Sequence, residues 1–177
     1  MKKKSLNVKK ISHNNFVLKY LNNKETLKIF KEFKKSIDIK NKYAVAISGG
    51  TDSIALAYMC KCLSEIYNTK FKYYLIDHKL RQESTNEAFK VLQILKKLKI
   101  DCKILTWRGK KPRSNIQSIA RNKRYDLLTK ECKKNKISYL LLGHHIDDVY
   151  ENFLLRILRG SGLKGLVSMD KLTESNF

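Results

Sequence analysis

Apolar and polar residues alternate along this chain with two different periods, and the changes of period divide it into strands and helices. From residue 23 to 37 apolar side chains recur at helical spacing, which indicates an amphipathic helix. Short apolar runs then alternate with longer helical segments. Strands are expected at 43–47, 71–76, 102–107 and 139–142, and helices at about 53–63, 84–98, 115–134 and 147–158.

Four strand–helix units in series predict an α/β fold, a doubly wound parallel sheet with helices on both faces. Ligands of such sheets bind at the carboxyl ends of the strands. The unusual polar segments of the chain follow the expected strands, at 48–53, 77–81, 107–115 and 143–148. We therefore expect one domain over residues 23–177 with its site at this edge, preceded by a polar N-terminal extension over residues 1–22.

The segment Ser48-Gly49-Gly50-Thr51-Asp52-Ser53 has the arrangement of a phosphate-binding loop. It joins an expected buried strand to an expected helix, so that free N–H groups and the positive end of the helix dipole converge on one point. The two glycines permit a close backbone approach, and the three hydroxyls can donate further hydrogen bonds. A tight turn with an aspartate helix cap is the alternative interpretation.

Asp52 indicates which kind of phosphate site this is. A Walker A loop would carry a lysine at this position, directly before the final serine or threonine. A carboxylate beside a triphosphate is repulsive unless a divalent cation lies between them. Asp52 therefore predicts Mg²⁺ bound jointly with the phosphates.

A second cluster of candidate functional residues is the segment Gly143-His144-His145-Ile146-Asp147-Asp148. Two adjacent histidines point in different directions, which disfavours a four-ligand zinc site. Asp148 and Glu151 share one face of the expected helix and could hold a cationic substrate. An ordinary acidic first turn of a helix is the alternative.

The formal charge of +22 favours a nucleic-acid partner, although most of it comes from lysines spread over the whole chain. All seven arginines lie between residues 81 and 159. The guanidinium group of arginine is a planar, bidentate hydrogen-bond donor, and its confinement to this stretch suggests that these arginines bind phosphates or carboxylates. Arg121 and Arg124 share a helix face and are candidates for contact with a triphosphate or an RNA backbone, or are two surface cations.

The sequence disfavours a membrane-spanning protein and a disulfide-bonded fold. There is no apolar run of membrane-spanning length, and the N-terminus lacks the apolar stretch of a signal peptide, so we expect a cytoplasmic protein with no membrane partner. The four cysteines, Cys60, Cys62, Cys102 and Cys132, form no C-x-x-C pair. They fit reduced core thiols better than disulfides or a metal site.

Taken together, the motifs resemble one family. The segment 48–53 resembles the PP-loop of the N-type ATP pyrophosphatases, and the later blocks are similar to the tRNA(Ile)-lysidine synthetases over about residues 43–168. Those blocks are Asp77-His78-Lys79-Leu80-Arg81 with Glu83-Ser84 and Glu87-Ala88, Ile116-Gln117 with Ala120-Arg121 and Arg124-Tyr125, Gly143-His144-His145 with Asp147-Asp148 and Glu151, and Leu154 to Leu166.

The resemblance implies a ligase that uses ATP and Mg²⁺. It would adenylate C2 of the wobble cytidine of tRNA(Ile) with a CAU anticodon, after which the side-chain amine of free L-lysine displaces AMP. The implied site residues are Asp52, His144 and Asp148 for catalysis; Ser48, Gly49, Gly50, Thr51, Asp52, Ser53, Arg121 and Gly143 for ATP; Asp52 and Asp148 for Mg²⁺; Asp148 and Glu151 for lysine; and Arg81, Lys110, Lys111, Arg113 and Arg124 for tRNA.

Several alternatives stay open at this point. Another PP-loop reaction on tRNA or a nucleotide is one, although thiolation normally needs reactive cysteines near the site. A non-catalytic, basic RNA-binding module is another. Members of the family usually continue with further helices, so the domain is expected to be truncated at its C-terminus. No protein partner is predicted, and a homodimer is left open.

Overall fold

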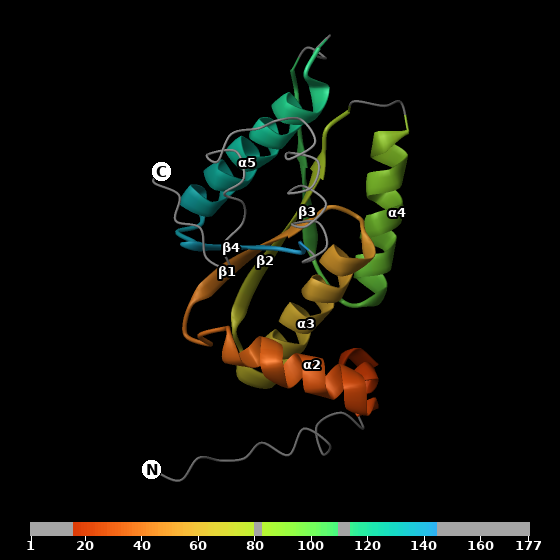
Figure 1. Ribbon diagram of the computed structural model, residues 1–177, viewed down its shortest axis with the longest axis vertical. Helices are drawn as coiled ribbons and strands as arrows, with labels where there is room; N and C mark the ends of the chain where they lie inside the picture. The colour runs from red at the N-terminus through yellow and green to blue at the C-terminus, as the bar shows by residue number, and fades with distance from the viewer. Residues whose placement is uncertain (1–15, 80–82, 110–113, 145–177) are drawn as a thin grey trace, which may run out of the picture.

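The centre of the molecule is a sheet of four parallel strands, seen in the computed structural model in Figure 1. The structure describes residues 16–79, 83–109 and 114–144. Their elements in chain order are η1 (Phe16–Asn22), α2 (Lys24–Lys35), β1 (Lys42–Ile47), α3 (Thr51–Tyr67), β2 (Lys70–Asp77), α4 (Ser84–Lys97), β3 (Cys102–Thr106), α5 (Ile116–Lys134) and β4 (Tyr139–Leu142).

The strand order is β3-β2-β1-β4, so the winding of the chain reverses between β1 and β4. Ile47 pairs with Leu75 of β2, and Ala46 pairs with Leu142 of β4. The carboxyl ends of these three strands therefore meet at one edge. A reversal of this kind opens a crevice at the strand ends, which is where doubly wound sheets bind ligands.

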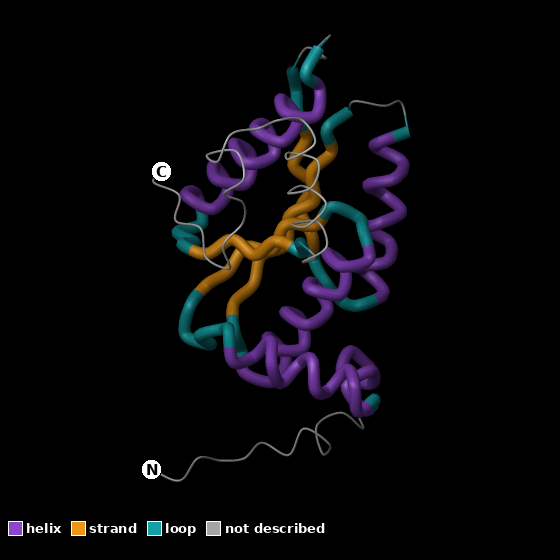
Figure 2. Tube along the Cα trace, in the orientation of Figure 1, coloured by secondary structure: helices purple, strands orange, loops and turns teal. Residues whose placement is uncertain are grey.

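Helices cover both faces of the sheet (Figure 2). Val45 and Ile47 of β1 pack with residues of α3 and α4, including Ala57 and Leu95. The alternate residues of β1, Ala44 and Ala46, pack on the opposite face with Leu128 of α5. This period of two, buried on both sides, confirms the predicted doubly wound α/β fold.

The N-terminal segment differs from the expectation. Val17, Leu18 and Leu21 of η1 are buried in one cluster with Phe30 of α2 and Leu63 of α3. Residues 16–22 thus pack with the domain and are not part of a polar extension, because three apolar side chains spaced along a short helix suffice to cover the end of α3. Residues 1–15 lie outside the described part of the chain.

Helix α3 is longer than the 53–63 expected from periodicity. It begins at Thr51, directly after the glycine turn, and continues to Tyr67, because Ile66 and Tyr67 pack against the cluster formed by η1 and α2. The expected helix at 147–158 lies outside the described residues. Among those described, no helix has the length and apolar character that a membrane crossing needs.

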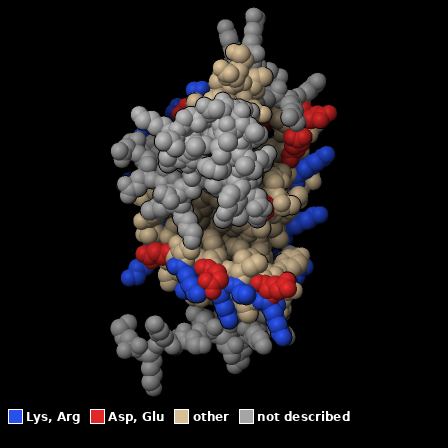
Figure 3. Space-filling view, in the orientation of Figure 1, with Lys and Arg blue, Asp and Glu red and all other residues tan. Residues whose placement is uncertain are grey.

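Basic and acidic side chains lie together on the described surface around α2. At the end of the molecule where α2 lies, Lys and Arg side chains alternate with Asp and Glu (Figure 3). Lys35 and Glu32 of α2 form an exposed ion pair there at 2.8 Å. Among the described side chains at this end, basic residues are thus interspersed with acidic ones.

Candidate functional site

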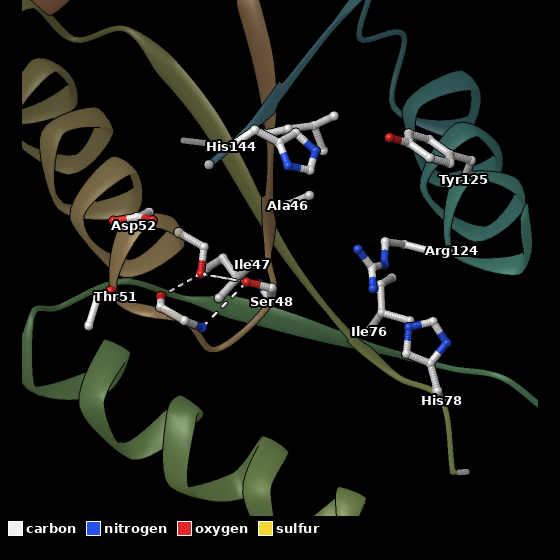
Figure 4. Close-up of a pocket in the computed structure, with 14 residues that line it drawn as sticks. Ala46, Ile47, Ser48, Thr51, Asp52, Ile76, His78, Arg124, Tyr125 and His144 are labelled. Atoms are coloured by element: carbon white, nitrogen blue, oxygen red, sulfur yellow. Dashed lines mark hydrogen bonds between the residues drawn. The ribbon is translucent and has the colours of Figure 1, made fainter. Parts of the chain in front are cut away.

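A cavity of about 300 Å³ lies at the carboxyl edge of the sheet, beside the reversal of winding (Figure 4). The phosphate-loop segment forms one wall, α5 forms another, and the end of β4 closes a third side. Its lining residues are Ala46, Ile47, Ser48, Gly50, Thr51, Asp52, Ser53, Ile76, His78, Arg124, Tyr125, Leu142, Gly143 and His144. The sequence predicted a site at this edge, and residues of three of the polar segments that follow strands, 48–53, 77–81 and 143–148, line the cavity.

Hydrogen bonds inside the loop fix its shape. The Ser53 hydroxyl donates to the Gly50 carbonyl oxygen at 2.8 Å and accepts the Ser48 backbone N–H at 3.2 Å. Ser53 is 2% exposed. In this structure the Ser53 hydroxyl proton is used within the loop, where it holds the turn; its predicted contact with ATP stays a prediction.

The beginning of α3 is open to a ligand. The N-cap residue Gly50 supplies no side-chain hydrogen bond to the first turn. Backbone N–H groups of a first helical turn have no partner within the helix, and together with the helix dipole they favour an anion. Thr51 and Asp52 are exposed in this turn and line the cavity.

Two glycines are required by geometry. Gly49 adopts a φ of +91°, which side chains rarely tolerate, whereas Gly50 has a φ of −73°. At Gly143 a Cβ atom would lie 2.8 Å from Cα and 2.9 Å from N of Ser53. The end of β4 thus contacts the backbone of the loop-to-helix junction directly, and only a glycine permits that approach.

The α5 wall carries Arg124 and Tyr125, which point toward the cavity in Figure 4. Arg124 lies midway between Ala120 and Leu128, the two buried residues of this helix, and therefore on the face turned to the sheet. The Arg121 guanidinium instead lies over the Tyr125 ring, 5.5 Å from its centroid. Arg124 lines the cavity and Arg121 does not, so the contact of Arg121 with ATP and that of Arg124 with tRNA stay predictions.

Asp77, at the end of β2, was given no role from the sequence. It is 3% exposed, and its carboxylate accepts hydrogen bonds from the Lys79 N–H, the Ser84 hydroxyl and the Thr85 hydroxyl at 3.0, 3.0 and 2.8 Å. Burial alone would raise the pKa of Asp77, but these three hydrogen bonds outweigh it and hold the pKa below its usual value. The ionised carboxylate thus fastens the β2–α4 connection, on which His78 stands.

His78 is the other residue that sequence reasoning did not assign. Its side chain is half-buried and lines the cavity beside Arg124. Burial lowers the pKa of His78, and the Arg124 charge lowers it further, against the smaller opposite effect of Asp77. The His78 imidazole is therefore protonated less readily than that of a free histidine. A serine and a threonine at the start of α4, following a strand that ends in aspartate, were the available signal for this arrangement.

The donors near the loop fit a magnesium ion shared with phosphates. In the described part of the chain, no group of three or more His, Cys, Asp or Glu side chains could hold a metal. Asp52 supplies one carboxylate at the cavity, and Mg²⁺ is commonly held by one or two carboxylates together with substrate phosphates.

Several predicted site residues lie outside the described residues. They are Arg81, Lys110, Lys111, Arg113, Asp148 and Glu151. Their predicted contacts with tRNA, lysine and Mg²⁺ stay predictions.

The fold and the loop at the helix N-terminus define a nucleotide-binding α/β domain. A family model for the PP-loop domain matches residues 21–177. The chain belongs to this PP-loop family.

The curated relatives that match this chain are tRNA(Ile)-lysidine synthases. The chain is 46% identical over 127 residues to the tRNA(Ile)-lysidine synthase of Orientia tsutsugamushi, covering 72% of this chain and 29% of that protein. It is 44% identical over 138 residues to that of the Wolbachia of Brugia malayi, with 77% and 32% covered, and 35% identical over 153 residues to that of Bradyrhizobium diazoefficiens, with 85% and 41% covered. The chain thus spans about a third of the length of these relatives.

A solved structure supports the fold. The U34-tRNA thiolase NcsA from Methanococcus maripaludis, with its [4Fe-4S] cluster, superposes with a TM-score of 0.64 at 23% identity. The match covers 80% of this chain and 53% of that one. At this identity the likeness concerns the fold alone.

Replacing Asp77 by Asn should make the free energy of unfolding depend less on pH in the acidic range. Because the pKa of Asp77 is lowered in the folded protein, its stabilising effect is present above the pKa of the unfolded chain, about 4, and disappears as the pH falls through the folded value. The variant should lose about 1–3 kcal/mol at pH 7, and the difference from wild type should shrink below pH 4. Urea unfolding across this range measures it. Asp101→Asn, at an exposed position, is the control, and an Asp77→Asn deficit that persists unchanged in acid contradicts the account.

Gly143→Ala should loosen the junction of β4 with α3. The added Cβ must push the strand end away from Ser53, at a cost of about 1–3 kcal/mol of unfolding free energy. Gly50→Ala is the matched control, since its Cβ would lie 3.5 Å from the Ser48 hydroxyl, an ordinary contact. Equal stabilities of the two variants in urea unfolding would show that the close approach of Gly143 is unimportant.

Proposed function

We propose that this chain is the ATP-binding catalytic domain of a tRNA(Ile)-lysidine synthase. The observation that carries the proposal is the cavity at the ends of β1 and β4, with the open N-terminus of α3 on one wall and Arg124 on the other. The similarity to tRNA(Ile)-lysidine synthases supports the substrates, which would be ATP, tRNA(Ile) with a CAU anticodon and free L-lysine.

The first step would be adenylation of the RNA base. The C2 carbonyl oxygen of the wobble cytidine attacks the α-phosphorus of ATP, a P–O bond forms, and the bond to pyrophosphate breaks. The first-turn N–H groups of α3 and the exposed Thr51 would hold the departing pyrophosphate. Arg124, from the opposite wall, would stabilise negative charge on the reacting phosphate. Asp52 would hold Mg²⁺ against the phosphates, where the ion offsets charge on the leaving group.

The second step would join lysine to the base. The lysine side-chain amine, after loss of a proton, attacks C2; a C–N bond forms, the C2–O bond breaks, and AMP leaves. Asp148 and Glu151 are proposed to hold the lysine cation and Asp148 to share the Mg²⁺, with His144 at the end of β4 contacting phosphate or substrate. Arg81, Lys110, Lys111 and Arg113 are proposed to contact the tRNA, whose phosphates attract such cations without regard to sequence.

The cysteines argue against thiol-based PP-loop chemistry. None of the four lines the cavity, and all are free. Burial raises the pKa of Cys62 to about 11 and that of Cys102 to about 12, so neither provides a thiolate at neutral pH. Ligation by an external amine needs no cysteine, which favours the proposed reaction.

Asp52→Ala should abolish the reaction without unfolding the protein. With ATP, Mg²⁺, tRNA(Ile) and labelled lysine, wild type should label the RNA and release AMP in proportion. The variant should be slower by about 100-fold or more, because the exposed carboxylate that would hold Mg²⁺ against the leaving pyrophosphate is removed. Glu32→Ala, on the exposed face of α2, is the control and should retain full activity. Lysine-independent AMP release with unlabelled RNA would refute the proposed reaction.

A further inference from the structure

Gly49 faces away from the cavity, toward α4. It is the one residue of the segment 48–53 that does not line the cavity. A Cβ atom on Gly49 would lie 3.1 Å from the Cγ2 methyl of Val91, so this methyl already occupies the space that a side chain would need. No other heavy atom of the described chain lies within 4 Å of that position, apart from the residues next to Gly49. Val91 therefore packs against the back of the loop, and Figure 4 shows α4, the green helix, on the side of the loop away from Arg124.

The turn at Gly49 depends on such an outside contact. Gly49 has a φ of +91°, but a glycine backbone adopts many other conformations almost as readily. The Ser53 hydroxyl holds the backbone of Ser48 and Gly50 on either side. Among the described residues, no hydrogen bond involves Gly49 itself. Packing against Val91 is therefore the contact that restricts this part of the loop.

Helix α4 is held firmly enough to provide this support. In its first turn, the hydroxyls of Ser84 and Thr85 donate to the buried Asp77 carboxylate at the end of β2. Two turns later, Val91 and Leu92 pack against the core cluster on this face of the sheet. A β-branched side chain has essentially one χ1 rotamer in a helix, so the methyls of Val91 have a defined position.

We propose that Val91 is a positioning residue for phosphate binding. Its Cγ2 methyl holds Gly49 at positive φ, and Gly49 leads directly into the N-cap residue Gly50 and the first turn of α3. The methyl thereby keeps the first-turn N–H groups aimed into the cavity. Groups that are already directed at a charge bind it without the cost of reorganisation. The proposal rests on the ATP binding proposed above and adds a residue that touches neither the nucleotide nor the reacting atoms.

Three substitutions on α4, made in the full chain, test the proposal. Val91→Ala removes the methyl, and it should fold because Val91 is only half-buried and alanine is the best helix former. Its affinity for inorganic triphosphate and for ATP, each with Mg²⁺ and measured by titration calorimetry, should fall about tenfold. Val91→Thr keeps both branches at Cβ, so both affinities should stay within about threefold of wild type.

Leu92→Ala is the matched control for lost packing. Leu92 packs against the same core cluster as Val91 but has no atom within 4 Å of the Gly49 Cβ position. Because it removes more buried apolar volume, this variant should lower the urea midpoint of unfolding at least as much as Val91→Ala. Its affinity for triphosphate should nevertheless equal that of wild type. An equal loss of affinity in both alanine variants would reveal only a general effect of packing and overturns the proposal.

A double-variant cycle checks the contact itself. The methyl added by Gly49→Ala meets Val91, so Gly49→Ala should lower the urea midpoint less in the Val91→Ala background than in the wild-type background. Equal shifts in the two backgrounds contradict the contact. Wild-type triphosphate affinity in Val91→Ala overturns the role of Val91 and leaves ATP binding standing. If the wild-type chain binds neither ATP nor triphosphate, both this inference and the proposed function fail.

Discussion

The site depends on the close approach of β4 to the first turn of α3. Gly143 leaves no room for a side chain against Ser53, and Ser53 in turn holds the loop through Gly50 and Ser48. These contacts keep the helix N-terminus in place beside the reversal of winding. The anion-binding groups there are backbone N–H groups, so their direction is set by the fold and not by flexible side chains.

A second fixed point faces the first across the cavity. The buried, ionised Asp77 fastens the end of β2 to the start of α4, and so determines where His78 stands. Arg124 reaches the same wall because α5 turns its Ala120–Leu128 face to the sheet. Under the proposed function the loop would hold phosphates, while the opposite wall combines the Arg124 cation with the half-buried His78 imidazole.

The features that could be predicted from the sequence are those carried by local patterns. The four strands and the glycine loop are of this kind, because periodicity and the Gly49-Gly50 turn report on neighbouring residues. Tertiary contacts decided the rest: η1 packs against α3, Ser53 donates within the loop, and Arg124 lines the cavity where Arg121 does not. The Arg124 placement could have been inferred from its spacing to Ala120 and Leu128, whereas the contact of Val91 with Gly49 joins two elements that no local pattern relates.

Backbone hydrogen exchange of the full chain, with and without ATP and Mg²⁺, tests most directly whether this edge of the sheet binds the nucleotide. The account predicts slower exchange on ATP addition at residues 48–53, 78–79 and 143–144. It predicts no change at the opposite edge, where another hollow is lined by Lys72, Lys99 and Lys103. Protection confined to that lysine-lined hollow, or the absence of any protection at saturating ATP, would contradict it.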